Sequence, residues 1–594
     1  MLAGPIFARE ALTAPRRIGH YLLRSGYVAF LLVLMYTIRQ ATIGFQDTKF
    51  AGDVATYSSL VFSVFAVLQL TLGMFFATLF TSANIAQEKD RRTLILLLMT
   101  DMKSRELTYG KLLASLLIVG VLVATSIPVF CILRLLGGVT WEQIIWAEAV
   151  IVSTALAAGT WGCLVAFWRQ KTFQTLSISV LGVVLYIALT EGLRTATVGT
   201  SFGNIMAMAA PYSALGQALN PFSGDFSGVA SVTALPSVVV FLSIALVLSL
   251  LTVARLRVWN PSQALRQTVL ADSQTTDEEA EQSADKIQPT TTSLAPTVKH
   301  RSVWNNPVSW KEIATRGYGK KVVYIKLAYI FLAAIIGYGM LTAVDPDRLV
   351  LGMVSPAAAA FLAISVISLL LVNAQAVTSI STERDSNTLD ILLATDISAK
   401  EFMLGKILGA LWNAREMIVV PLILLVLAMV TLPASGITFE NLIYLIAAYV
   451  VLSLFATMLG LHSGLTYENS RAAIGNSLGT MFFLFVGIFI FMLLLVEARS
   501  SFAIQMQSFI VFIGLGSIGL YSSLTYKNPS NALTIAAIVL PFLTFYAITD
   551  FLLGGSLGVS LAICMAYGFA SIAMLIPSIS DFDVALGKTT QDDG

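Results

Sequence analysis

The sequence predicts an all-α polytopic membrane protein made of two parallel repeats, with six spans in the first and six or eight in the second, and with both termini in the cytoplasm. The chain of 594 residues is 57% hydrophobic and only 12% charged, whereas soluble domains carry about 25% charged residues. Long apolar runs recur along the whole chain, and one polar segment occurs twice, 295 residues apart. This composition excludes a large soluble enzyme.

The apolar runs define the spans, because a bilayer core requires about 20 apolar residues per helix. We expect spans near residues 26–45, 56–83, 111–136, 142–166, 173–190, 236–254, 322–343, 355–380, 405–431, 441–465, 473–496, 506–525, 531–553 and 556–578. The region 506–553 is ambiguous, because it forms either two extra spans or a re-entrant hairpin on the outer side. Both choices leave the carboxyl terminus on the same side.

The distribution of basic residues predicts the orientation. With the amino terminus inside, 28 of the 36 lysines and arginines fall at positions that this map places in the cytoplasm. Cytoplasmic loops carry such an excess. The first apolar run follows Arg16, Arg17 and Arg24, and it is too long for the apolar region of a signal peptide. The three cysteines and three histidines are scattered, so neither a disulfide framework nor a metal cluster is predicted.

Residues 258–303 differ from the rest of the chain. They are polar, acidic and rich in Thr, Ser and Pro, and such a segment buries too little apolar surface to fold. We therefore expect a disordered cytoplasmic linker between a first half, residues 1–257, and a second half, residues 304–594. Because both halves begin on the same side of the membrane, the repeat is parallel and not inverted.

The segment before the first span of each half is also duplicated. Four positions match in register, namely Pro5 with Pro307, Arg9 with Lys311, Glu10 with Glu312, and Thr13 with Thr315. Asn306 is a good N-cap, and proline is favoured at the first helical position after it. Short basic amphipathic helices lie in the plane of the membrane interface. We expect such an interface helix in each half, the alternative being an unstructured basic tail.

The duplicated polar segment runs from Glu88 to Lys111 and again from Glu383 to Lys406. Eleven of its 24 positions are identical, where unrelated segments would match at roughly one or two. Each copy lies in the cytoplasmic loop between the second and third spans of its half. Both halves are therefore expected to present the same cytoplasmic surface.

Each copy predicts a short helix with one leucine face. Thr93 and Thr388 are the expected N-caps. Residues three and four apart share a helix face, which groups Leu94, Leu97 and Leu98 in the first copy and Leu389, Leu392 and Leu393 in the second. Burying one leucine is worth about 1.5–3 kcal/mol, so two such triads suffice to hold a partner with matching grooves. The alternative is that each triad packs on its own bundle; duplication in register favours the partner.

Polar residues frame each leucine face. One carboxylate ends the second span of each half and another closes each short helix: Glu88, Asp101, Glu383 and Asp396. Ser398 and Glu401 have the spacing of a capping box, whereas the first half has Lys103 at the first position, so that its cap must be made differently. Lys111 and Lys406 are expected to snorkel at the membrane boundary.

This motif, E-x-x-x-x-T-L-x-x-L-L after a second span with G-K at the start of the third, resembles the permease subunit of ABC-2 type transporters. The resemblance covers nearly all of both halves, without residues 258–303 and the apolar excess near 506–553. In that family the short loop helix is a coupling helix that docks on a separate ATPase subunit. The resemblance thus implies docking by Glu88, Thr93, Leu94, Leu97, Leu98, Asp101, Glu383, Thr388, Leu389, Leu392, Leu393 and Asp396.

The resemblance also implies an exporter in the bacterial cytoplasmic (inner) membrane. The chain departs from the family pattern because it fuses two permease halves and because its second half has extra hydrophobic length. It has no phosphate-binding loop G-x-x-x-x-G-K-[ST]; the nearest text, Gly587–Thr589, lacks the first glycine, since Phe582 stands there. We therefore expect a non-enzymatic chain without its own cofactor. ATP and Mg would sit on two copies of an ABC ATPase partner, and the lipid bilayer, but no nucleic acid, is a further partner.

Charged residues near the predicted spans are the remaining candidates. Two pairs follow the fifth span of each half and form a candidate outer gate, or only anchor helix ends: Glu191 with Arg194, and Glu497 with Arg499. Arg415 and Glu416 lie inside the ninth predicted span, where each charge costs about 2.5–3.5 kcal/mol. A structural pair and a substrate contact both fit them.

A secondary active transporter is the alternative function, because parallel six-span repeats also suit that class. It would require a matched carboxylate or histidine near the membrane midplane in both halves, and the sequence shows no such pair. An intramembrane enzyme or a scaffold has no motif in its favour.

Overall fold

The computed structural model describes residues 4–13, 18–42, 51–197, 199–219, 234–260, 304–314, 322–341, 356–386, 388–393, 395, 397–431, 438–491, 502–526 and 530–585. Every regular element within these ranges is a helix, which confirms the all-α prediction. The predicted linker, residues 258–303, lies outside the described residues except for its first three positions, which end the last helix of the first half.

Eleven helices in the described ranges are long and apolar enough to cross a membrane, and twelve if the bent pair α16 (Ala399–Asn413) and α17 (Arg415–Thr431) forms one span. The chain is therefore an integral, multi-pass membrane protein. Two further helices, α2 (Ile18–Thr42) and α21 (Phe502–Leu524), coincide with predicted spans but are not among the eleven.

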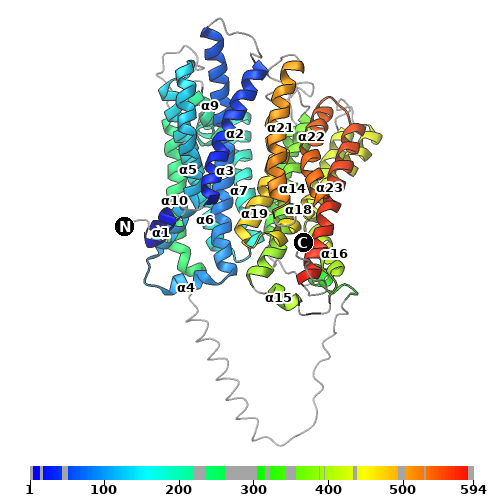
Figure 1. Cartoon of the computed structure of the whole chain (residues 1–594). Coiled ribbons are helices and arrows are strands. Elements are labelled where there is room, and N and C mark those ends of the chain that lie inside the picture. The colour runs from blue at the N-terminus through cyan, green and yellow to red at the C-terminus, as the bar shows by residue number, and fades with distance from the viewer. Residues whose placement is uncertain are drawn as a thin grey trace, which may run out of the picture.

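The first half forms one bundle, drawn blue to green in Figure 1. Its other helices are α1 (Gly4–Thr13), α3 (Ala51–Asp90), α4 (Thr93–Met99), α5 (Ser104–Leu136), α6 (Trp141–Trp168), α7 (Thr172–Ala196), α8 (Ser201–Ala209), α9 (Pro211–Leu219) and α10 (Leu235–Trp259). The helix α3 packs on α6 and α7, and α10 packs on α6.

The second half forms a neighbouring bundle, drawn green to red in Figure 1. Its other helices are α12 (Pro307–Ala314), α13 (Val322–Leu341), α14 (Pro356–Asp385), α15 (Thr388–Leu393), α18 (Phe439–Thr466), α19 (Ser470–Phe482), the π-helix η3 (Phe483–Gly487), α22 (Asn531–Leu552) and α23 (Leu557–Ala585). Here α14 packs on α18 and α19, and α23 packs on α18.

The short helices also occupy corresponding places. α1 packs on α5 and α12 packs on α16, so both expected interface helices are present as helices. α4 and α15 lie at the same end of the molecule in Figure 1, and we call this the loop-helix end. Each follows the helix on which it packs, α3 and α14 respectively.

The two bundles meet along a continuous seam. α7 contacts α13 and α14, α3 contacts α19, and α2 contacts α21. One apolar cluster in this seam contains Leu79, Ala83, Leu176, Ala374, Val377, Ala473, Ile474 and Leu478. The rings of Phe75 and Phe482 stack across it with their centroids 4.9 Å apart. Burial of these apolar side chains holds the halves together.

The ambiguous region near 506–553 forms the two helices α21 and α22, which pack on each other. α22 is among the helices long enough to cross a membrane, whereas the apolar part of α21 is the shorter segment Phe509–Leu524. The Phe512 ring stacks on Phe491 at 4.0 Å between centroids and lies 6.2 Å from Phe30 of α2. The extra length therefore adds contact with the first half.

Candidate functional site

The entry into each short helix differs from the prediction. Thr93 and Thr388 are the first residues of α4 and α15, not their N-caps. Each hydroxyl donates to the carbonyl oxygen five residues earlier, at 3.3 Å for Glu88 and 3.0 Å for Glu383. The threonines are thus occupied in satisfying carbonyl groups at the end of the preceding span, which a helix leaves without partners.

Arg92 precedes α4 with a φ of 59°, in the left-handed region that residues with a Cβ rarely adopt. This conformation reverses the chain between α3 and α4. The equivalent position in the second copy is Asn387, which lies outside the described residues.

The end of each short helix is also closed by a threonine. The hydroxyl of Thr100 donates to the carbonyl of Leu97, and that of Thr395 to Leu392, both at 2.6 Å. Asp101 is exposed beyond the end of α4, and Asp396 lies outside the described residues. Closure by the aspartate is therefore wrong for α4.

The predicted capping box of Ser398 and Glu401 is confirmed. The Ser398 hydroxyl accepts from the Glu401 amide at 3.3 Å, and the Glu401 carboxylate accepts from the Ser398 amide at 3.1 Å. In the first half only the second bond has a counterpart, from the Lys103 amide to Glu106 at 3.2 Å, because a lysine side chain cannot accept.

The leucine face points inward. Leu94 is only 2% exposed and belongs to a cluster of its own half with Ile85, Leu107, Phe167 and Leu256. The expectation that all six leucines face a partner is therefore wrong for Leu94. Its burial removes apolar surface from water and fixes α4 on the bundle.

The other leucine side chains that the structure describes also pack inward, against their own half. Leu97 and Leu98 pack against the cluster around Leu94, and Leu389 and Leu392 pack against the core of the second half. The side chain of Leu393 lies outside the described residues.

Apolar side chains on the opposite face are the exposed ones. Leu96 and Met99 on α4 are each 64% exposed, and Ile391 on α15 is 67% exposed. Leu96 and Ile391 are 295 residues apart and so occupy equivalent positions of the two copies. The two equivalent apolar positions are visible in the sequence, but the leucine spacing that both copies share favoured the inward face.

A buried ion pair lies under each short helix. Glu88 pairs with Lys111, and Glu383 pairs with Lys406 at 2.8 Å. The lysine side chains are only 10% and 1% exposed, so the prediction that they snorkel is wrong. A lysine buried in a membrane helix requires a counter-charge, and the carboxylate that ends the preceding span supplies it.

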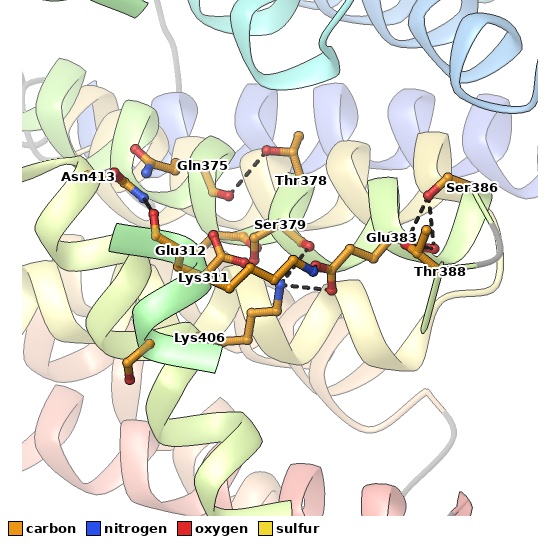
Figure 2. A network of polar contacts seen from close by, with 12 residues as sticks. Lys311, Glu312, Gln375, Thr378, Ser379, Glu383, Ser386, Thr388, Lys406 and Asn413 are labelled. Atoms are coloured by element: carbon orange, nitrogen blue, oxygen red, sulfur yellow. Dashed lines mark hydrogen bonds and ion pairs between the residues drawn. The ribbon is translucent and has the colours of Figure 1, made fainter. Parts of the chain in front are cut away.

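In the second half this pair extends to the interface helix (Figure 2). Lys406 lies 2.6 Å from Glu312, and Lys311 lies 2.8 Å from Glu383. Alternating charges therefore join α12, α14 and α16. The predicted interface-helix residues Lys311 and Glu312 belong to the same site as the loop-helix residue Glu383.

α12 lies close against α16. Its N-cap is Asn306, whose side-chain oxygen accepts from the Ser309 amide at 3.0 Å, with Pro307 at the first helical position as predicted. A Cβ at Gly405 would lie 2.7 Å from the Cβ of Val308, and one at Gly409 would lie 2.5 Å from that of Glu312. Only glycine permits this approach.

The first half has the simpler arrangement. Pro5, Arg9 and Glu10 lie on α1, which packs on α5. Among the described side chains, however, Glu88 and Lys111 form an ion pair without Arg9 or Glu10. The two copies of the site thus share the central pair and differ in its surroundings.

The residue after Glu88 is Lys89, and the residue after Glu383 is Arg384. The sequence analysis assigned no role to either cation. Lys89 donates to the carbonyl groups of Phe167 at 2.6 Å and Arg169 at 2.8 Å, and Arg384 donates to Gly464 at 2.8 Å. Both cations therefore satisfy carbonyls at the carboxyl end of the fourth span of their half, where positive charge is favourable.

The next residue is an aspartate in both copies. Asp90 accepts a hydrogen bond from Thr172, the first residue of α7, and Asp385 accepts one from Ser470, the first residue of α19. The triplet Glu–cation–Asp therefore connects the end of the second span to the third, fourth and fifth spans. Its repetition in the sequence was the signal that could have found it.

One ion pair joins the two halves at this end. Arg91 Nε lies 3.2 Å from Asp385 Oδ1, and Arg91 Nη2 donates to Asn469 Oδ1 at 3.5 Å. The residue equivalent to Arg91 in the second copy is the uncharged Ser386. The second copy therefore cannot form the equivalent ion pair.

The candidate outer gate is described in one half. Glu191 and Arg194 form an ion pair at 2.9 Å, and the other oxygen of Glu191 accepts from the Ser213 amide at 3.1 Å. The pair thus ties the end of α7 to α9. Glu497 and Arg499 lie outside the described residues.

Arg415 and Glu416 lie at a bend and not inside a straight span. α16 and α17 meet here at 53°. Arg415 lies 3.2 Å from Glu416, whose second oxygen lies 2.6 Å from Lys326 of α13. The structural pair predicted for Arg415 and Glu416 therefore includes a third residue, because Lys326 also pairs with Glu416.

Within the described ranges, no group of three or more histidine, cysteine, aspartate or glutamate side chains is placed to hold a metal ion. The chain was also compared with known proteins. No model of a protein family matches it, and no curated protein matches it either.

Proposed function

We propose that this chain is the membrane-spanning subunit of an ATP-driven transporter of the ABC-2 type, an exporter with two permease halves in one polypeptide. It binds two copies of a separate ATPase through α4 and α15. The observation that carries this proposal is the exposure of Leu96 and Ile391, at equivalent positions of two short helices at the same end of the molecule.

The anchoring of these helices fits a role in force transmission. Helices of six or seven residues are not stable alone, and α4 is held by buried Leu94, by Thr93 and by the Glu88–Lys111 pair beneath it. A partner that displaces α4 therefore also displaces α3 and α5. The same argument applies to α15, α14 and α16.

The proposed path for the substrate is the seam between the halves. Apolar side chains of α3, α7, α14 and α19 meet there. Closure of the two ATPase copies would move both short helices and open this seam to one side. The Glu191–Arg194 pair would then frame the outer end of the path.

The test is the double variant Leu96→Asp with Ile391→Asp. A carboxylate cannot enter an apolar interface without a large desolvation penalty, so we expect at least a tenfold loss of co-purified ATPase from detergent extracts, equivalent to about 1.4 kcal/mol. The matched control is Val258→Asp, which adds a charge at an exposed apolar residue near the same end, on α10. Absence of any Walker-motif ATPase from the wild-type preparation, or an unchanged yield with the double variant, would refute the proposal.

One residue favours the alternative, a secondary active transporter. Glu148 lies in α6 and accepts hydrogen bonds from Gln69 at 3.3 Å and Ser126 at 3.2 Å. An ionisable residue inside a span is a candidate for ion coupling. Uptake driven by an ion gradient in vesicles without ATP, and its loss in Glu148→Gln, would replace the proposed function with this one.

A further inference from the structure

A large apolar cavity lies between the first half and the first span of the second half. Its volume is about 780 Å³, and its wall is formed by α6, α7, α10 and α13 together with Met74 and Pro211. Representative lining residues are Ile178, Leu181, Phe241, Leu248 and Ala328. This volume falls in the range of about 300–1,000 Å³ that is usual for small-molecule sites.

One cation lines the cavity at its loop-helix end. Arg169 stands in the turn between α6 and α7, close to Lys89, which binds its carbonyl group. Its guanidinium lies 3.4 Å from the centre of the Trp168 ring. Tyr324 of α13 lines the same end of the cavity.

Arg169 has no counter-charge among the residues that the structure describes. The residue is 5% exposed, and its buried Nε has no hydrogen-bond partner. No carboxylate of the described residues forms an ion pair with it. Burial lowers the pKa of this guanidinium below its ordinary value. A buried cation that has only the Trp168 ring beside it is costly, so an anion is the partner that this site favours.

The shape and position of the cavity define the class of anion. Along α7 its wall runs from Ile178 to Leu189, a length of about 16 Å at 1.5 Å per residue. This wall belongs to a helix long enough to cross the membrane. A tryptophan and a tyrosine at the charged end are typical of the membrane–water interface. An apolar slot with one cation at the interface matches a phospholipid.

We propose that this cavity binds one anionic phospholipid from the leaflet at the loop-helix end. Its phosphate pairs with Arg169, and an acyl chain lies along α7 and α13. The inference needs only the membrane location of the chain and not the proposed ATPase partner. Because α13 belongs to the second half, the lipid would also fill a gap between the halves.

The experiment uses the full-length protein in detergent with two photoactivatable phospholipids, phosphatidylglycerol and phosphatidylcholine, each with a diazirine on the acyl chain. We expect phosphatidylglycerol to label α7 and α13 peptides at least tenfold more than phosphatidylcholine. Arg169→Gln should remove that preference, and Arg169→Lys should retain part of it. The matched control is Lys171→Gln, two residues away and exposed, which should leave the labelling unchanged.

A second variant guards against misfolding of Arg169→Gln. Ala157→Phe adds a ring to the apolar wall and leaves Arg169 in place, so it should reduce labelling by both lipids. Equal labelling by the two lipids in the wild type, or full phosphatidylglycerol labelling in both variants, would overturn the proposal. Loss of labelling on addition of inorganic phosphate alone would also overturn it, because the site would then bind a free anion.

Discussion

The two buried lysines, Lys111 and Lys406, contribute unequally to the stability of the protein. Lys406 is 1% exposed and pairs with both Glu312 and Glu383, whereas Lys111 pairs with Glu88. Removing one member of a buried ionic group leaves the other charges without compensation. The two lysines occupy equivalent sequence positions, but their removal should have unequal effects.

We expect Lys406→Met to destabilise the protein by about 3–5 kcal/mol, because Glu312 loses its cation and Glu383 keeps only the partly exposed Lys311. Lys111→Met should cost less, since one carboxylate is affected. Thermal unfolding in detergent measures both, with Lys400→Met at an exposed position of α16 as the control. A larger effect for Lys111→Met would contradict the assignment.

The left-handed backbone of Arg92 gives a second prediction at this scale. Such a conformation costs roughly 1–2 kcal/mol for a residue with a Cβ, and asparagine tolerates it better. Arg92→Asn should therefore raise the unfolding temperature. Arg105→Asn, at an exposed helical position of α5, removes the same charge without that benefit. If both variants behave alike, the backbone explanation fails.

At the scale of elements, the site depends on short helices held by longer ones. α4 and α15 are fixed by threonine hydroxyls at both ends and by burial of their inner faces. α12 is fixed through two glycines of α16. Helices of this length are not stable in isolation. The position of each short helix therefore depends on the longer helices on which it packs.

We expect Gly409→Leu to push α12 away from α16 and to separate Glu312 from Lys406. The measurable results are a lower unfolding temperature and faster proteolysis within α12. Gly339→Leu in α13 is the control, because no atom lies within 4 Å of a Cβ there. Equal proteolysis of the two variants would show that the glycine contact does not hold α12.

At the scale of the whole molecule, the described parts of the two halves are joined by an apolar seam and by the Arg91–Asp385 ion pair at the loop-helix end. Asp385 is buried, whereas the Arg91 side chain is 42% exposed. Because the Arg91 end of the pair is open to solvent, water and salt screen its charge and the pair contributes little to stability. The apolar seam therefore provides most of the stability of the contact between the halves. The Arg91–Asp385 pair helps to define their relative position.

Arg91→Gln should consequently lower stability by no more than about 1 kcal/mol at low ionic strength, and the difference from the wild type should shrink in high salt. Phe75→Ala, which removes a partly buried aromatic contact of the seam, should cost up to about 3 kcal/mol at either ionic strength. Melting curves at two salt concentrations distinguish the two cases. A salt-independent loss in Arg91→Gln would indicate a different role.

The sequence predicted the helical elements well because apolar length is a local property. The spans, the interface helices and the Ser398 capping box could all be read from neighbouring residues. The ion pairs could not, because Lys406 and Glu312 are distant along the chain and meet only when α12 packs on α16. The direction of the leucine face also depends on packing, since either face of α4 carries apolar residues.

The chain makes both bundles in one polypeptide, but it does not make them alike. Four linked charges brace the second bundle beneath α15, and a single pair braces the first beneath α4. A load applied equally to the two sides would therefore bend the first side more. Two copies of the proposed ATPase would therefore meet unequal resistance from the two short helices.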